Sequence, residues 1–116
     1  MDYPRYEIFR DAKKEFRFRL KSKNYEIILT ASEGYDSKYD CQNAISICQR
    51  NSPYDVDYDR RTTQSGKPYF VLRSDNKKDI GRSEDYSSVT AREEGIKDVK
   101  RDGPTKTIVD QTLVNA

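Results

Sequence analysis

The chain contains two similar segments, and this internal repeat constrains its fold more than any other feature of the sequence. A segment that begins at residue 15 aligns with one that begins at residue 67, with an offset of 52 residues before a single one-residue gap and 51 after it. The identical pairs are spread along both segments: Phe18/Phe70, Leu20/Leu72, Ser22/Ser74, Asn24/Asn76, Ile28/Ile80, Ser32/Ser83, Glu33/Glu84, Tyr35/Tyr86, Ser37/Ser88, Ile45/Ile96, Arg50/Arg101, Pro53/Pro104 and Asp59/Asp110. We therefore expect two copies of one structural unit.

Each copy has the pattern of three strands followed by a helix. Phe16, Phe18 and Leu20 alternate with basic residues, a period of two that is typical of a strand. Strands are predicted at residues 5–10, 16–21 and 25–30, at 56–63, 67–73 and 78–82, and, short and last, at 106–110. Helices follow Ser37 and Ser88, whose hydroxyls are suited to capping the first turn, and end at the turns 51–53 and 102–104.

These elements predict an α+β fold of tandem βββα repeats with pseudo-two-fold symmetry, in which two helices pack on an antiparallel sheet or sheets. The repeats are assigned to residues 1–59 and 60–110, and residues 111–116 to a frayed C-terminal tail. Val, Ile, Leu and Phe together number 22 of 116 residues, about 19%, which is few for two separate cores. We therefore expect one compact unit with a shared core.

The residues also resemble a known family. Residues 16–24 read F-R-F-R-L-K-S-K-N, residues 32–38 read S-E-G-Y-D-S-K, and residues 41–46 read C-Q-N-A-I-S before a closing R-N-S-P at 50–53. This pattern is similar to the YegP-like family, small bacterial proteins without an assigned function. The resemblance implies βββα units, often in tandem. The family has no known catalytic residues that could be assigned to positions of this chain. The resemblance also implies a Gly after the turn Asn, where this chain carries Tyr25 and Lys77.

Composition excludes several classes of function. The chain has no His, which removes the commonest general base and most mixed Cys/His zinc sites, and its two Cys are too few for a four-thiolate zinc site. No apolar run approaches the ~20 residues that cross a bilayer, and the first residues do not have the pattern of a secretory signal. We expect a cytoplasmic, non-enzymatic protein with no cofactor, no metal and no membrane partner.

Basic and aromatic residues on three predicted strands form a candidate binding face. It comprises Arg17, Arg19, Lys21, Arg10, Tyr69 and Arg73. Arginine can bind phosphates and tyrosine can stack on bases, so this face could bind single-stranded nucleic acid. The charge balance opposes that interpretation, because residues 1–59 have a net charge of −1 and residues 60–116 only +3. A solvated sheet face is the simpler explanation.

A Ser-Glu-x-Tyr corner recurs before each helix. Its residues are Ser32, Glu33 and Tyr35 in the first repeat and Ser83, Glu84 and Tyr86 in the second. Two carboxylates could perform acid-base chemistry if they converge. We expect a structural role instead, in which the carboxylate accepts backbone amides and the tyrosine packs under the helix.

Two further groups have simple explanations. Cys41 and Cys48 are seven residues apart on one predicted helix, about 10 Å, which is too far for a disulfide, so we expect two reduced core residues. Asp55, Asp57 and Asp59 alternate along a predicted strand and would share one face, with weak cation binding at most.

The leading hypothesis is a module that binds another macromolecule, most simply a protein, through sheet edges or an exposed Tyr/Arg face; an exposed subset of the nine Tyr residues could mark such a surface. Single-stranded nucleic acid is the alternative partner. An enzyme is the third possibility and requires an enclosed pocket where Glu33, Glu84 or a Cys meets a ligand. We expect a monomer with an internal pseudo-dimer, or a weak homodimer.

Overall fold

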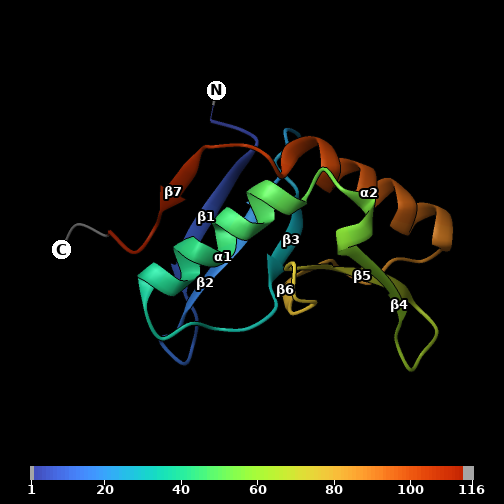
Figure 1. Ribbon diagram of the computed structural model, residues 1–116, viewed down its shortest axis with the longest axis horizontal. Helices are drawn as coiled ribbons and strands as arrows, with labels where there is room; N and C mark the ends of the chain where they lie inside the picture. The colour runs from blue at the N-terminus through green and yellow to red at the C-terminus, as the bar shows by residue number, and fades with distance from the viewer. Residues whose placement is uncertain (1, 114–116) are drawn as a thin grey trace.

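Two helices and seven strands make up the fold (Figure 1). The computed structural model describes residues 2–113. In chain order its elements are β1 (Arg5–Arg10), β2 (Phe16–Lys21), β3 (Ile27–Ala31), α1 (Lys38–Asn51), the 3₁₀ turn η1 (Asp55–Asp57), β4 (Tyr58–Thr62), β5 (Pro68–Arg73), β6 (Asp79–Arg82), α2 (Val89–Asp102) and β7 (Ile108–Asp110). Both helices begin where the sequence predicts. The Ser37 hydroxyl accepts from the Asp40 amide and the Ser88 hydroxyl from the Ala91 amide, each at 3.0 Å.

All seven strands belong to one mixed sheet in the order β4-β5-β6-β3-β2-β1-β7. Its centre is the antiparallel pairing of β3 with β6, where Thr30 lies opposite Arg82 and Ala31 opposite Gly81. The prediction of an antiparallel sheet was wrong at one edge, because β7 runs parallel to β1. The chain reaches this edge after a helix, a connection long enough to bring it back in the same direction as β1.

Most predicted strand boundaries are correct to within one or two residues. After α1, residues 55–57 form η1, and the strand predicted from residue 56 begins at Tyr58. The strand predicted from residue 25 begins at Ile27 because Ser22 and Tyr25 close a turn through the Tyr25 amide and the Ser22 carbonyl, 2.9 Å apart. At the C-terminal end, Gln111 continues the edge through its amide, which donates to the Ile8 carbonyl at 2.9 Å. The rest of the predicted tail, from 114 to 116, lies outside the described residues.

One hydrophobic core lies between the sheet and the helices and draws on both repeats. α1 contacts β2, β5 and β6, and α2 contacts β5 and β3, so each helix packs on strands from both repeats. The fully buried side chains at its centre include Phe18, Leu20, Ile45, Phe70, Leu72 and Ile96. These six residues are three of the identical pairs of the repeat: Phe18/Phe70, Leu20/Leu72 and Ile45/Ile96.

Two tyrosine hydroxyls, one from β1 and one from β4, bind carbonyls at the C-terminal ends of the helices. The Tyr6 hydroxyl donates to the Gly103 carbonyl at 2.8 Å, and the Tyr58 hydroxyl donates to the Ser52 carbonyl at 2.6 Å. Because carbonyls at a helix C-terminus have no partner within the helix, these bonds satisfy groups that burial would otherwise leave unpaired.

The last residue of each helix reaches the other repeat. The Asn51 amide group donates to the Arg73 carbonyl at 3.0 Å, and the Asp102 carboxylate accepts from the Lys23 amide at 3.1 Å. Asn51 and Asp102 are both buried, so these bonds fix each helix end against a strand turn of the opposite repeat. Within residues 2–113 no helix is both long and apolar enough to cross a membrane.

Candidate functional site

The side of the sheet that faces away from the helices, here called the uncovered face, carries five of the six residues predicted to bind a partner. Strand alternation with the core residues places them there: Arg17, Arg19 and Lys21 of β2, and Tyr69 and Arg73 of β5. The sheet order puts β6 and β3 between these two strands, so the residues form two groups on the uncovered face.

Arg10 does not lie on the uncovered face, and its assignment to the predicted binding surface was wrong. Its position in β1 has the same parity as Tyr6 and Ile8, which point into the core. The Arg10 guanidinium lies 4.4 Å from the centre of the Phe16 ring, and its Nε donates to the Lys14 carbonyl at 3.1 Å.

In the group on β1 and β2, a fully buried carboxylate is surrounded by three cations. Glu7 lies opposite Arg19 and next to the pair Arg5 and Lys21. Arg19 Nε donates to Glu7 Oε1 at 2.7 Å, Arg5 Nε to Oε2 at 2.9 Å, and Lys21 Nζ lies 3.7 Å from Oε1. Burial by itself would raise the pKa of Glu7, but the hydrogen bonds from Arg19 and Arg5 and the charge of Lys21 hold this pKa below its usual value. We call these four residues the Glu7 cluster.

Arg17, on the same strand, is occupied by other partners. Its Nε donates to an Asp11 carboxylate oxygen at 2.8 Å and its Nη1 to the Ala31 carbonyl at 3.1 Å. These bonds connect the β1–β2 turn to the end of β3.

In the group on β4 to β6, most cations are balanced by neighbouring acids. Arg61 bridges Asp59 and Asp79, with nitrogen–oxygen distances of 2.7 and 2.8 Å. The guanidinium of Arg82 lies 4.1 Å from the centre of the Tyr69 ring and covers it. A base could stack on the covered side of Tyr69 only after displacing Arg82, so the structure does not favour Tyr69 as a stacking residue.

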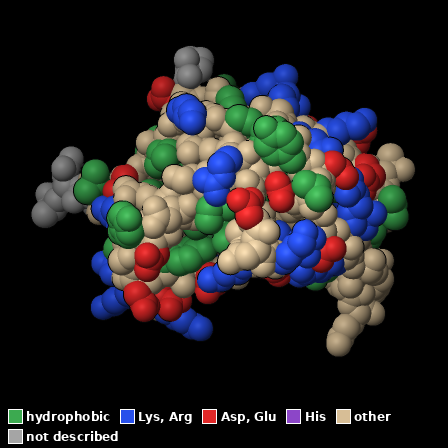
Figure 2. Space-filling view, in the orientation of Figure 1, with side chains coloured by type: hydrophobic (Ala, Val, Ile, Leu, Met, Phe, Trp, Pro, Cys, Tyr) green, Lys and Arg blue, Asp and Glu red, His purple; other side chains and the backbone are tan. Residues whose placement is uncertain are grey.

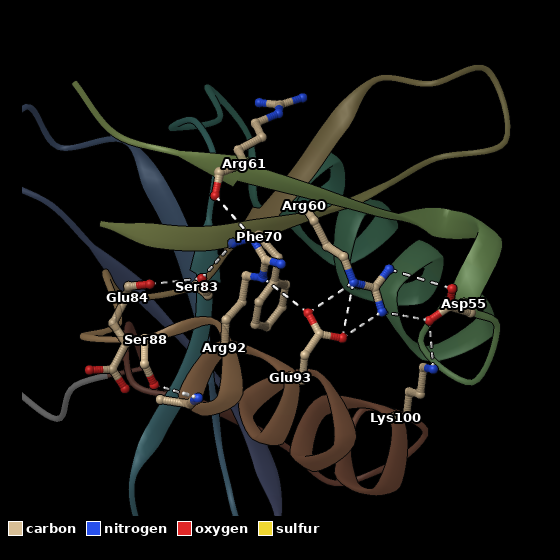
Figure 3. A network of polar contacts seen from close by, with 11 residues as sticks. Asp55, Arg60, Arg61, Phe70, Ser83, Glu84, Ser88, Arg92, Glu93 and Lys100 are labelled. Carbon is tan, nitrogen blue, oxygen red and sulfur yellow. Dashed lines mark hydrogen bonds and ion pairs between the residues drawn. The ribbon is translucent and has the colours of Figure 1, made fainter. Parts of the chain in front are cut away.

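The two Ser-Glu-x-Tyr corners form the junctions between sheet and helix, as expected. Ser83 Oγ accepts from the Phe70 amide at 2.9 Å and donates to the Glu84 carbonyl at 2.8 Å (Figure 3). Tyr86 stacks on Phe70, with ring centres 6.2 Å apart and planes 9° apart. In the first repeat the Ser32 amide donates to the Ile80 carbonyl at 2.9 Å.

The expected role of the corner glutamates was wrong, since serine rather than glutamate accepts the backbone amide at the second corner. Glu33 is exposed and pairs with Lys78 of the β5–β6 turn at 3.1 Å, and Glu84 is exposed at the other corner. Glu33 lies at the rim of a groove whose lining does not include Glu84, so the two carboxylates do not converge on that cavity.

This groove, of about 620 Å³ and open to solvent, runs beside the N-terminal half of α1 and is called the α1 groove. It lies between α1, the segment that enters it, and the β5–β6 turn. Its floor includes the apolar Ala44, Ile47 and Ile80, and its acidic side chains are Glu15, Glu33, Asp36 and Asp40. Figure 2 shows acidic side chains near this end of α1, at the lower left. The α1 groove therefore combines an apolar floor with negative charge.

Tyr35 lines the α1 groove, and its hydroxyl is buried beneath the surface. Its oxygen is buried and has no hydrogen-bond partner among the described residues, and burial raises the pKa of Tyr35 to about 12. Tyr86 occupies the equivalent position, where a methyl group built on Gly95 would collide with its hydroxyl. The position equivalent to Gly95 is Ala44, whose methyl group takes up that space.

The three aspartates after α1 do not share a strand face, so that prediction was wrong. Asp55 and Asp57 belong to η1, and Asp55 pairs with Arg60 and Lys100 (Figure 3). The distances from Asp55 Oδ1 are 2.9 Å to Arg60 Nη2 and 2.8 Å to Lys100 Nζ. Across residues 2–113, no three Asp, Glu or Cys side chains are grouped as metal ligands.

Both cysteines are free and buried on the core side of α1, as their spacing predicts. Burial raises the pKa of the Cys41 thiol to about 11 and raises that of Cys48 as well. At neutral pH both are protonated thiols, which are poor nucleophiles and poor metal ligands.

Comparison with known proteins identifies the family. The model of the domain of unknown function DUF1508 matches the chain twice, at residues 11–59 and 64–110. The chain belongs to the DUF1508 family. A UPF0339 protein from Shewanella oneidensis is 43% identical over 107 residues, which are 92% of this chain and 96% of that protein, and the UPF0339 protein YegP from Escherichia coli K12 is 39% identical with the same coverage. The predicted YegP-like resemblance is therefore confirmed.

Solved DUF1508 relatives have the same fold. The solution NMR structure of a Shewanella oneidensis UPF0339 protein has a TM-score of 0.84 at 42% identity and covers 90% of this chain and 88% of its own. The solution NMR structure of Escherichia coli YegP, described as a protein of unknown function, has a TM-score of 0.88 at 38% identity and covers 95% of this chain and 94% of its own. DUF1508 membership thus fixes the fold and supplies no activity.

Sequence reasoning missed the α1 groove and the aromatic pair beside the Glu7 cluster. The groove joins Asp36 and Asp40 to Lys78, residues about forty positions apart that only the β3–β6 pairing brings together. The rings of Tyr3 and Tyr25 meet at 4.7 Å beside Arg5. Alternation along β1 could have placed Arg5 with Glu7, but no local pattern joins Tyr3 to a turn 22 residues later.

Proposed function

We propose that this DUF1508 protein is a non-enzymatic module that binds a basic segment of another protein in the α1 groove. The observation that carries the proposal is the composition of the groove, in which an apolar floor lies beside an excess of carboxylates. Four acidic side chains and the single cation Lys78 line it, a net charge of −3 from 4 negative and 1 positive.

A peptide with alternating basic and apolar side chains fits this chemistry. Its apolar side chains would cover Ala44, Ile47 and Ile80, and its basic side chains would meet Asp36 and Asp40. Peptide grooves commonly combine such apolar contacts with charges that set specificity.

Other partners and an enzymatic role have less support. A nucleic-acid phosphate would be repelled by the groove's negative charge. Of the groups considered for catalysis, only Glu33 lies in the groove, where it is exposed and paired with Lys78; Glu84 and the two cysteines are not among the lining residues. Free cysteines are usual in a reducing compartment, and we propose a cytoplasmic location for a protein whose two cysteines are unpaired.

We also infer that the two repeats are related by a pseudo-two-fold axis between β3 and β6. The antiparallel pairing of these strands is the contact that such an axis requires. The tyrosine hydrogen bonds at the two helix ends form a matched pair, since Tyr6 to Gly103 and Tyr58 to Ser52 join equivalent positions. This arrangement supports a monomer that is internally a pseudo-dimer.

The groove proposal is tested with two fluorescein-labelled nonapeptides, one in which arginine alternates with valine and one in which glutamate replaces each arginine. The arginine peptide is expected to bind at low salt and the glutamate peptide is not. The variant Asp36→Asn with Asp40→Asn is expected to weaken binding about tenfold or more, because each carboxylate contributes roughly 1 kcal/mol to a charged hydrogen bond.

The matched control is Glu94→Gln with Asp98→Asn, which removes two acidic charges from the outside of α2. It changes the net charge by the same amount and leaves the groove intact. Equal effects of the two double variants would mean that the peptide responds to overall charge, and the groove proposal would be wrong. Absence of any arginine-peptide binding at low salt would also contradict it.

A further inference from the structure

The Glu7 cluster has more positive charge than its carboxylate balances. Arg5, Arg19 and Lys21 share the single acid Glu7, which leaves a net charge of +2 from 3 positive and 1 negative. The four residues form two directly opposite pairs on β1 and β2, Arg5 with Lys21 and Glu7 with Arg19. In contrast, Arg61 on the same face has two acids to itself.

Burial hides the carboxylate and leaves the cations accessible. Glu7 is 0% exposed, whereas the side chains of Arg19, Lys21 and Arg5 are 26%, 25% and 17% exposed. Both Glu7 oxygens are already hydrogen-bonded, to Arg19 and Arg5. A ligand that approaches the uncovered face at this point would therefore contact guanidinium and ammonium groups rather than the acid.

An aromatic pair lies beside these cations. The Arg5 guanidinium is 4.3 Å from the centre of the Tyr3 ring, and the Tyr3 and Tyr25 rings meet edge to face at 4.7 Å and 86°. Tyr25 is 59% exposed at the tip of the β2–β3 turn. The protein thus has an accessible ring next to a cluster of excess cations, which Tyr69 does not provide because Arg82 covers it.

We propose that the Glu7 cluster and Tyr25 form a binding site for single-stranded nucleic acid. Phosphates contact Arg5, Arg19 and Lys21, and one base stacks on Tyr25. A duplex would use the cations but has no free base for the ring, and an acidic peptide would likewise leave the ring unused. This site lies on the uncovered face, away from the helix side that holds the α1 groove, so it stands or fails independently of the proposed function.

The probe is a 5′-fluorescein-labelled dT12, titrated with the full chain and followed by anisotropy at several salt concentrations. Three phosphate contacts predict a slope of about −2 for the logarithm of the binding constant against the logarithm of salt concentration, and Lys21→Gln is expected to reduce its magnitude by about 0.7. Loss of the stacked base in Tyr25→Gly is expected to weaken binding about fivefold or more with little change in slope.

The chain offers a matched control for the ring. Lys77 occupies the equivalent turn in the second repeat, and both Tyr25 and Lys77 have positive φ values of 72° and 70° that glycine accepts without strain. Lys77→Gly therefore makes the same backbone change away from the cluster, and both variants are expected to fold. It also removes one positive charge, so Arg82→Gln is tested beside it as a control for charge on the uncovered face.

Three results would overturn the proposal. One is the absence of dT12 binding at low salt. Another is an equal loss of affinity in Tyr25→Gly and Lys77→Gly, which would assign the effect to the turns rather than the ring. The third is binding of a 12-base-pair duplex or a polyglutamate peptide as tight as that of dT12, which would mean that the cations act without Tyr25.

Discussion

At the scale of single residues, three non-glycine residues among those described have a positive φ, and two of them, Tyr25 and Lys77, are equivalent in the two repeats; the third is Lys14. Tyr25 and Lys77 occupy equivalent places in the β2–β3 and β5–β6 turns and adopt the left-handed region. The YegP-like resemblance implies glycine at this position, and the structure gives the reason, because a residue with a Cβ atom is strained there. Both turns thus keep the left-handed geometry that favours glycine, although they carry Tyr25 and Lys77.

This strain predicts a stabilising substitution. Replacing Lys77 with Gly is expected to raise the free energy of unfolding by about 0.5–1 kcal/mol, because the relief of left-handed strain, about 1–2 kcal/mol, exceeds the added flexibility of the unfolded chain. Lys77 is exposed, so little packing is lost. Urea unfolding measures the change, with Lys97→Gly, in the exposed part of α2, as a control that is expected to destabilise. A lower urea midpoint for Lys77→Gly would contradict the explanation.

At the scale of elements, strand positions were predictable where alternation is strict. Arg17, Arg19 and Lys21 share a face because they alternate with buried Phe18 and Leu20, and the sequence shows that directly. Arg10 was predicted to share the face of Arg17, although its spacing from Tyr6 and Ile8 along β1 places it on the opposite side of the sheet. The α1 groove could not be predicted, because its walls come from segments that meet only through the β3–β6 pairing.

The 3₁₀ turn η1 shows a different limit of local patterns. Alternating aspartates in residues 55–59 suggested a strand, but Asp55 instead accepts from Arg60 of β4 and from Lys100 of α2. Arg60 also contacts Glu93, so these ion pairs connect the turn, the edge strand and the helix (Figure 3). The local alternation gives no sign of these tertiary ion pairs, which hold η1 beside β4 and α2.

These contacts predict a pH dependence. Hydrogen bonds from Arg60 and Lys100 lower the pKa of Asp55 to about 2. Because the folded pKa is lower than the unfolded value of about 4, the carboxylate stabilises the protein above pH 4, and this contribution is lost as the pH falls toward 2. Asp55→Asn is expected to lower stability at pH 7 by less than about 1 kcal/mol, since the side chain is largely exposed.

Thermal unfolding of both proteins at pH 7 and pH 2 measures the effect. The difference between the native chain and Asp55→Asn should be present at pH 7 and nearly absent at pH 2. Asp57→Asn is the control, because it removes a charge from the same turn and Asp57 has no ion pair within residues 2–113. An equal loss in both variants at pH 7 would assign the effect to net charge.

At the scale of the whole molecule, a small number of large apolar residues suffices because both repeats use the same core. Phe18 and Leu20 pack in one cluster with Phe70 and Leu72, and each helix contacts strands of both repeats. The two repeats approach each other closely between β3 and β6, where a methyl group built on Gly81 would lie 2.7 Å from Leu29 Cδ2. Neither repeat can bury its apolar side chains without the other.

This shared core predicts the behaviour of the separate halves. The chain is divided before β4, into residues 1–57 and 58–116, because β4 pairs with β5 in the second half. Each half alone is expected to be unfolded or to self-associate, since it loses the β3–β6 pairing and the partner of its helix end. Mixed in equal amounts, the halves should recover the far-ultraviolet circular dichroism of the full chain and elute together as one 1:1 complex in size-exclusion chromatography. A half that is folded and monomeric by itself would show that the core is not shared in the way the packing implies.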